Sequence, residues 1–192
     1  MYKLDGVRLQ IVLSAKLEHN EHMALNDTLK SKISDEIKRL EEDCSHSGKA
    51  HFNASSRWNN LNYWFGIPSV VISALIGTAF FKDYAVTASL GSAAVTILTA
   101  LITFLKPAEK ATAHKGSGDQ YLALRNDARV FRELVLHQDI EEAAAMESLM
   151  GLTTRRNELN QASSLFSDGD FKKARDGINA GQSLHAVDKK QA

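Results

Sequence analysis

The residues of this sequence with the clearest capacity for chemistry are histidines at short spacing. His19 and His22 lie three residues apart, so on a helix their rings would share one face and could bind one metal ion. Two ligands do not complete a site, and Asn20 stands where a zinc-protease helix needs a glutamate after its first histidine. We therefore interpret both histidines as solvated surface residues.

Other reactive groups are equally sparse. Cys44, His46 and His51 form a loose cluster that we interpret as structural, and a lone cysteine fits a reducing compartment. No phosphate-binding glycine loop, dinucleotide fingerprint or nucleophile elbow occurs. The sequence predicts no catalytic, cofactor-binding or metal site, and a membrane-bound enzyme using His19, His22 and His114 is the weakest hypothesis.

Charge argues against a nucleic-acid partner. The 192 residues contain 23 basic and 23 acidic side chains, so no basic excess is present to neutralise phosphates. The charges are segregated, because nearly all of them lie outside one central block.

That central block predicts two membrane spans. It holds 24 consecutive uncharged residues between Arg57 and Lys82, and another 22 between Asp83 and Lys106. As helices these runs would be about 36 and 33 Å long, and each would cross a hydrocarbon core of roughly 30 Å. The alternative is a soluble bundle with two buried helices, which rarely lack charge over such lengths.

Aromatic residues and prolines punctuate these runs. Four aromatic residues are expected to act as anchors at the membrane interface: Trp58, Tyr63, Trp64 and Tyr84. Pro68 is expected near the start of the first helix and Pro107 beyond the end of the second.

The short connection makes the two spans antiparallel and puts both flanks on one side. These flanks are richer in lysine and arginine than the turn, which carries only Lys82, so the positive-inside rule places both termini in the cytoplasm. We expect an N-terminal helical region at 1–57, a hairpin at 58–106 with spans at about 61–81 and 84–105, a helical region at 107–181 and a flexible tail at 182–192.

The flanks show helical patterns. The first is an amphipathic series capped by Asn26 or Asp27, formed by Leu25, Leu29, Ile33, Ile37 and Leu40. The second is a stripe that calls for a helical partner, formed by Tyr121, Leu124, Ala128, Phe131 and Val135.

Several boundaries follow from local signals. Gly116 to Gly118 predicts a break or hinge before the second stripe. Further helices are expected over about 140–160 and around Phe171 to Ile178, after a turn at Phe166 to Gly169. The first dozen residues suit a strand or a helix equally.

Small and hydroxyl residues form one face on each span. The helix-packing face of the first consists of Gly66, Ser69, Ser73 and Gly77. The hydroxyl stripe of the second consists of Ser89, Ser92, Thr96, Thr99 and Thr103, opposite a face containing Leu90, Ile97, Leu101 and Leu105. The hydroxyls either bond to their own helix while packing on a neighbour, or line water in an oligomeric pore.

The order of these features resembles the SLATT family, two-transmembrane proteins of bacterial conflict systems. The resemblance rests on aromatics leading into Gly66-Ile67-Pro68, on Ser73 to Thr78, on the hydroxyl-rich second span, on Ala111, His114, Tyr121 and Leu124, and on Arg155 to Asn160 before Phe171 to Arg175. It implies an all-α membrane protein of the bacterial inner membrane, with no enzyme activity.

The same resemblance implies a homo-oligomeric, pore-forming effector in anti-phage abortive infection, triggered by a separate sensor or a nucleotide second messenger. The hydroxyl stripe would line the pore. The alternative is a membrane anchor or scaffold that docks a cytosolic partner through the stripe from Tyr121 to Val135 without conducting ions.

Overall fold

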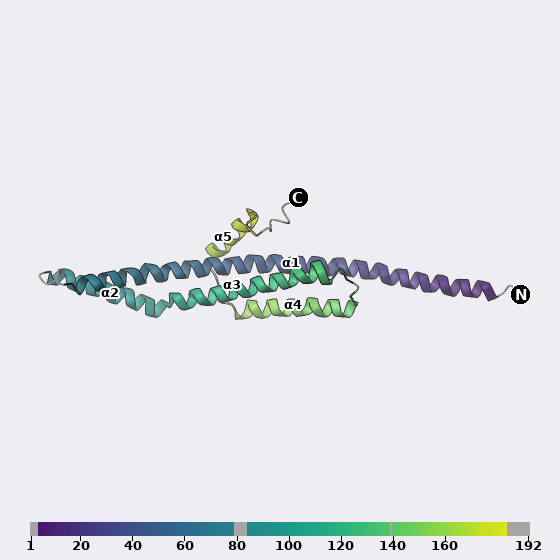
Figure 1. Ribbon diagram of the computed structural model, residues 1–192, viewed down its shortest axis with the longest axis horizontal. Helices are drawn as coiled ribbons and strands as arrows, with labels where there is room; N and C mark the ends of the chain where they lie inside the picture. Colours follow the sequence, from purple (N-terminus) through teal and green to yellow (C-terminus); the bar gives the residue numbers. More distant parts are fainter. Residues whose placement is uncertain (1–3, 79–83, 139, 184–192) are drawn as a thin grey trace. The chain divides into compact units, whose positions relative to one another are not determined.

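All the regular secondary structure in the part of the chain that the structure describes is helical. A computed structural model describes the backbone of residues 4–78, 84–138 and 140–183, and side chains within these ranges from Asp27 onward. Its elements are α1 (Leu4–Ile76), α2 (Ala85–Leu105), α3 (Pro107–Val130), the π-helical turn η2 (Phe131–Val135), α4 (Glu142–Ala162) and α5 (Asp168–Asn179) (Figure 1). The predicted all-α class is confirmed.

α1 is longer than the sequence patterns indicated. It runs without a break through Asn26 and Asp27 and across the expected boundary at residue 57, so the prediction of a helix cap at 26 or 27 is wrong. Its first residues are helical, which decides between the strand and helix alternatives. Pro68 lies inside α1 and not near the start of a helix. Proline at this position removes one backbone hydrogen bond of α1 but does not end the helix.

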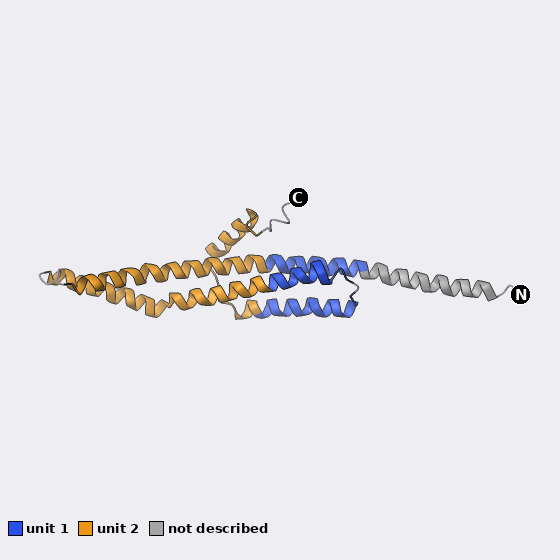
Figure 2. Ribbon diagram, in the orientation of Figure 1, with its two compact units in different colours: residues 1–43, 124–158 blue, residues 44–123, 159–192 orange. Residues whose placement is uncertain are grey.

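The first of two compact units contains residues 1–43 and 124–158 (Figure 2). Its parts of α1, α3 and α4 each carry buried apolar residues, in agreement with the predicted amphipathic series. The core consists of Ile33, Ile37, Leu40, Leu124, Ala128, Phe131, Leu136, Ala145 and Leu149. Leu29 is half-buried, and the side chain of Leu25 lies outside the described residues.

Ion pairs border this core. Arg132 Nε lies 2.7 Å from Glu41 Oε1, with both side chains mostly buried, and Arg155 Nη1 lies 2.6 Å from Asp127 Oδ2. The Arg132 pair joins η2 to α1, so it fixes the π-helical turn against the unit's longest helix. A charge-assisted pair of this kind also satisfies the hydrogen-bonding groups of both side chains, whose burial without partners would be unfavourable.

The second unit contains residues 44–123 and 159–192, and small side chains bring its helices α1 and α3 together. Ala50, Ala54 and Ala111 are buried, and Ser55 Oγ donates a 2.8 Å hydrogen bond to the Ala111 carbonyl. At Gly118 an added Cβ would lie 3.0 Å from the Phe52 ring. Only glycine permits this approach without displacing the ring.

Gly118 also corrects a prediction. α3 continues through Gly116, Ser117 and Gly118, so the hinge expected there does not form. Glycine has a low helix propensity, but the close contact between α3 and α1 compensates for this unfavourable term.

A left-handed residue separates α2 from α3. Lys106 has φ 48° and ψ 53°, and its N–H donates to the Ile102 carbonyl at the C-terminus of α2. The next residue, Pro107, is buried and begins α3, where a missing N–H costs least. The expected helix end at Pro107 is confirmed, with α3 starting directly after a one-residue joint.

α5 begins with a reciprocal cap. The Asp170 backbone N–H donates to Ser167 Oγ, and the Ser167 backbone N–H donates to the Asp170 carboxylate. This arrangement satisfies two backbone donors that otherwise lack helical partners. The final helix predicted around Phe171 to Ile178 is confirmed, with its first residue at Asp168.

Candidate functional site

The second unit exposes a large apolar surface on α2. This 21-residue helix has no buried residue, and Phe104 is 86% exposed and Val86 76% exposed. Among the described residues, one helical stretch, beginning at Ala85, is long and apolar enough to cross a membrane. A core helix of a soluble protein can meet the same criteria, but here none of the apolar window is buried.

The end of α1 is also apolar and exposed. Trp64 is 75% exposed, Val70 70% and Ile67 60%. The expected first span at 61–81 extends past Ile76, where α1 ends, and its residues 79–81 lie outside the described residues. The expected second span at 84–105 coincides with α2 and its N-terminal flanking residue Tyr84.

These two apolar segments contact each other at Gly91. A Cβ added there would lie 2.9 Å from Ile76 Cδ1 and 3.4 Å from Ile72 Cγ2. Because glycine has no side chain, α2 approaches α1 closely at this position, and the branched residues of α1 fill the space.

The predicted helix-packing residues of α1 occupy different environments. Ser69 is buried and donates a 2.7 Å hydrogen bond to the Phe65 carbonyl, Gly66 is half-buried, and Ser73 and Gly77 are exposed. A Cβ added at Gly66 would meet nothing within 4 Å, and one at Gly77, directly after α1, would meet only the Ser73 and Ala74 carbonyls of that helix. Within one chain, the part of this face with Ser73 and Gly77 is therefore uncovered, whereas Ser69 is not.

All five residues of the hydroxyl stripe are exposed. Four of the hydroxyls donate to the carbonyl four residues earlier, at 2.9 Å in each case: Ser89, Ser92, Thr96 and Thr103. Such bonds satisfy the hydroxyl proton inside a helix, while the oxygen retains the capacity to accept a further hydrogen bond. Both alternatives for the stripe, contact with a neighbouring helix and contact with water, are compatible with this geometry.

The stripe from Tyr121 to Val135 lies mostly inside the chain. Tyr121, Leu124, Ala128 and Phe131 are buried and Val135 is half-buried. In the second unit, Tyr121 Oη donates a 2.6 Å hydrogen bond to Asn160 Oδ1. The chain's own helices therefore cover most of the surface that the sequence pattern assigned to a partner.

A buried histidine pair joins α1 to α3. His51 Nδ1 and His114 Nδ1 are 3.0 Å apart, and the His51 ring stacks on Tyr121 and meets the edge of Phe166. Burial, and then the charge of His114, lowers the pKa of His51 to about 4. Burial and the nearby Arg57 guanidinium lower the pKa of His114, which Asp170 partly offsets.

We did not predict this histidine pair from the sequence, although the sequence contains a signal for it. Small or ring residues recur every three or four positions on both helices, at Gly48, His51 and Ser55 and at Ala111, His114 and Gly118. Two such series predict a close helix pair in which the histidines meet. Among the described side chains, no three potential ligands come close enough to hold a metal ion, and His19 and His22 lie outside them.

A carboxylate network lies beside the histidines. The Asp170 side chain is 7% exposed and accepts hydrogen bonds from Arg57 Nη2 at 2.9 Å and from Ser167 Oγ at 2.7 Å. Burial alone would raise the pKa of Asp170, but the hydrogen bonds from Arg57 and Ser167 outweigh it and lower the pKa. Asn53 Nδ2 also donates to the Asp170 carbonyl, at 3.0 Å, so α5 is held to α1 by side-chain and backbone contacts.

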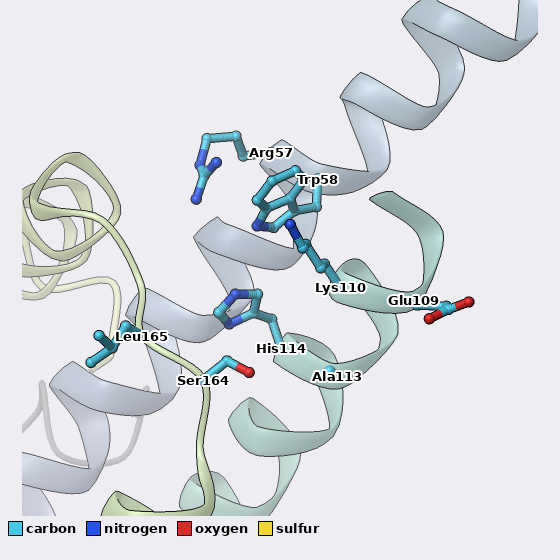
Figure 3. A pocket seen from close by; sticks show the side chains of 8 residues that line it. All are labelled: Arg57, Trp58, Glu109, Lys110, Ala113, His114, Ser164 and Leu165. Atoms are coloured by element: carbon cyan, nitrogen blue, oxygen red, sulfur yellow. The ribbon is translucent and has the colours of Figure 1, made fainter. Parts of the chain in front are cut away.

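A pocket of about 410 Å³ adjoins this network, and no sequence pattern indicated it. Its walls come from α1, α3 and the segment that leads into α5 (Figure 3). The lining residues are Arg57, Trp58, Glu109, Lys110, Ala113, His114, Ser164 and Leu165. The pocket therefore combines cations, a carboxylate, an indole, an imidazole and a hydroxyl where the uncharged run of α1 begins.

Comparison of the chain with protein-family models, curated proteins and solved structures gave no match.

Proposed function

We propose that this chain is an oligomeric membrane effector of the SLATT type. It crosses the bacterial inner membrane twice, through the end of α1 and through α2, and assembles into a pore that depolarises the cell during phage infection. The observation that carries the proposal is that none of the residues of α2 is buried within the chain. Water is a poor solvent for 21 uncharged, mostly apolar residues, whereas a bilayer is a good one.

Oligomerisation follows from the number of spans. Two helices cannot enclose a channel, so several copies must contribute. The exposed residues Ser73 and Gly77, with the half-buried Gly66, provide small residues for close contact with a neighbouring copy. The exposed hydroxyls of α2 then provide a polar face for the lumen.

Membrane integration is tested by alkaline carbonate extraction of membranes from expressing cells. We expect the protein in the pellet, because uncharged spans are held by the hydrocarbon and not by headgroup charge. Release into the supernatant would contradict the proposal at its first step.

The pore is tested by replacing Thr96 or Thr99 by leucine. If these hydroxyls face water in the open oligomer, leucine narrows and dries the lumen, and ion flux decreases at equal membrane abundance. Leu101→Val, on the opposite face, removes one methylene and serves as the control. Depolarisation is measured with a membrane-potential dye after induced expression, with crosslinking to verify the oligomer.

Full depolarisation by both Thr96→Leu and Thr99→Leu would mean that this face does not meet water. Stable membrane insertion without growth arrest or depolarisation in the unmodified protein would favour the non-conducting scaffold instead.

A further inference from the structure

We propose that the pocket between α1 and α3 binds a phosphate-bearing anion, with the headgroup of an anionic phospholipid as its source. The choice of a lipid rests on the proposed membrane function, whereas the choice of a phosphate rests on the pocket itself.

The cations of the pocket surround one aromatic ring. Lys110 Nζ lies 4.3 Å from the centroid of the Trp58 ring, and Arg57 Cζ lies 5.1 Å from it. Each of these cation–π contacts stabilises a cation beside the indole ring. Among the described residues, no carboxylate forms an ion pair with Lys110, so its charge is available to a ligand.

The remaining polar groups complete a set suited to a phosphate. Arg57 uses Nε and Nη2 on Asp170, and Nη1 is not among those contacts. Ser164 contributes a hydroxyl to the wall, and His114 an imidazole. Arginine, lysine and hydroxyl donors around a volume of about 410 Å³ match the several acceptor oxygens of a phosphate ester.

The one carboxylate that lines the pocket does not block it. Glu109 pairs with Lys106 at 3.2 Å, and Figure 3 shows its carboxylate directed away from Trp58 and His114. The Glu109 carboxylate is therefore turned away from the indole and imidazole of the pocket.

The position of the pocket favours a lipid over a soluble anion. Trp58 is the first residue of the uncharged run in α1, and Lys110 follows the end of α2 by five residues. In a membrane-spanning chain, both residues would lie at headgroup depth, where tryptophan rings settle and basic pockets meet anionic lipids.

Fluorescence of Trp58 tests the proposal directly. In a Trp64→Phe background Trp58 is the sole tryptophan, so its emission reports on the pocket. The full chain in an uncharged detergent is titrated separately with short-chain phosphatidylglycerol, phosphatidylcholine, glycerol 3-phosphate and inorganic phosphate. We expect a saturable change with phosphatidylglycerol at lower concentration than with the other three.

Lys110→Gln is the decisive variant. It should weaken phosphatidylglycerol binding about tenfold, which corresponds to the loss of one charge-assisted contact. Lys115→Gln, which removes an exposed lysine of α3 that pairs with Asp119 and does not line the pocket, should bind as tightly as the parent. Glu109→Gln removes the only lining carboxylate and should tighten binding.

The possible outcomes separate clearly. Equal weakening of phosphatidylglycerol and glycerol 3-phosphate binding by Lys110→Gln would support a phosphate site whose source is soluble as well as lipidic. Equal affinity of Lys110→Gln and Lys115→Gln, or no saturable signal with any anion, would overturn the proposal. Because binding is measured in detergent, a failed pore assay leaves this result intact, and a failed titration leaves the pore proposal intact.

Discussion

The imidazoles of His51 and His114 make the contact between α1 and α3 sensitive to pH. His51 is 1% exposed and its pKa in the folded protein is about 4, whereas an unfolded histidine titrates near 6.5. The unfolded chain therefore binds a proton first as the pH falls. The stabilising contribution is complete above about pH 6.5 and is lost progressively toward pH 4.

Thermal unfolding of the detergent-solubilised protein should show this dependence. Between pH 7.5 and 5.0 we expect the free energy of unfolding to fall by about 2 kcal/mol through His51, or roughly 4–8 °C in Tm. His114 acts in the same direction. His51→Phe keeps a ring between Tyr121 and Phe166 but cannot titrate, so its Tm should fall less over the same range.

The control for the pH experiment is His137→Gln, which removes an exposed histidine. It should retain the pH dependence of the parent protein. An equal decrease in Tm for His51→Phe and the parent would show that the buried pair is not the source.

Residues of the candidate site differ in how well the sequence could predict them. The position of the hydroxyl stripe follows from helical spacing alone, because each member depends only on its own helix. The Arg57 to Asp170 contact joins residues 113 positions apart. No local sequence pattern predicts a contact between residues so far apart in the chain. The network and the pocket beside it could therefore be identified only from the structure.

At the scale of elements, glycines decide how closely the helices pack. Gly118 of α3 faces the Phe52 ring, and Gly91 of α2 faces Ile72 and Ile76. Glycine has a low helix propensity, so the segment from Gly116 to Gly118 predicts a hinge when the sequence is considered alone. The long-range contact that makes glycine favourable at 118 is invisible to a local pattern.

A matched pair of substitutions tests this account. Gly118→Leu should destabilise the protein by about 1–3 kcal/mol, since its first side-chain carbon already crowds Phe52. Gly116→Leu should be neutral or slightly stabilising, because a Cβ there meets nothing within 4 Å and leucine favours helix. Thermal unfolding of the two variants measures the difference, and similar Tm values would exclude a special role for Gly118.

The extent of α1 was also difficult to predict from the sequence. Its polar and apolar parts have different compositions, and such a change usually marks a boundary between elements. An α-helix satisfies its backbone hydrogen bonds internally, so the same helical geometry is possible beside polar and apolar surroundings, and α1 continues across the change in composition.

At the scale of the whole molecule, the number of membrane crossings determines where the two ends of the chain lie. If the end of α1 and α2 both cross, the N- and C-termini share one side. If only α2 crosses, they lie on opposite sides. The positive-inside rule predicts the cytoplasm for both termini of a hairpin.

Reporter fusions distinguish these cases. A fluorescent protein that matures only in the cytoplasm and a phosphatase that folds only in the periplasm are each fused to either terminus. We expect cytoplasmic behaviour at both ends. A periplasmic signal at one end would reduce the chain to a single span and would require α1 to remain outside the hydrocarbon.

The one-residue joint between α2 and α3 has a mechanical consequence. Only the two torsion angles of Lys106 lie between these helices, and Pro107 opposes the right-handed helical conformation that would merge them into one rod. No flexible loop lies between α2 and α3 that could absorb a displacement of either helix. A swing of α3 would therefore reach α2 as a rotation about Lys106, so a movement in the polar part of the chain becomes a tilt of its apolar helix.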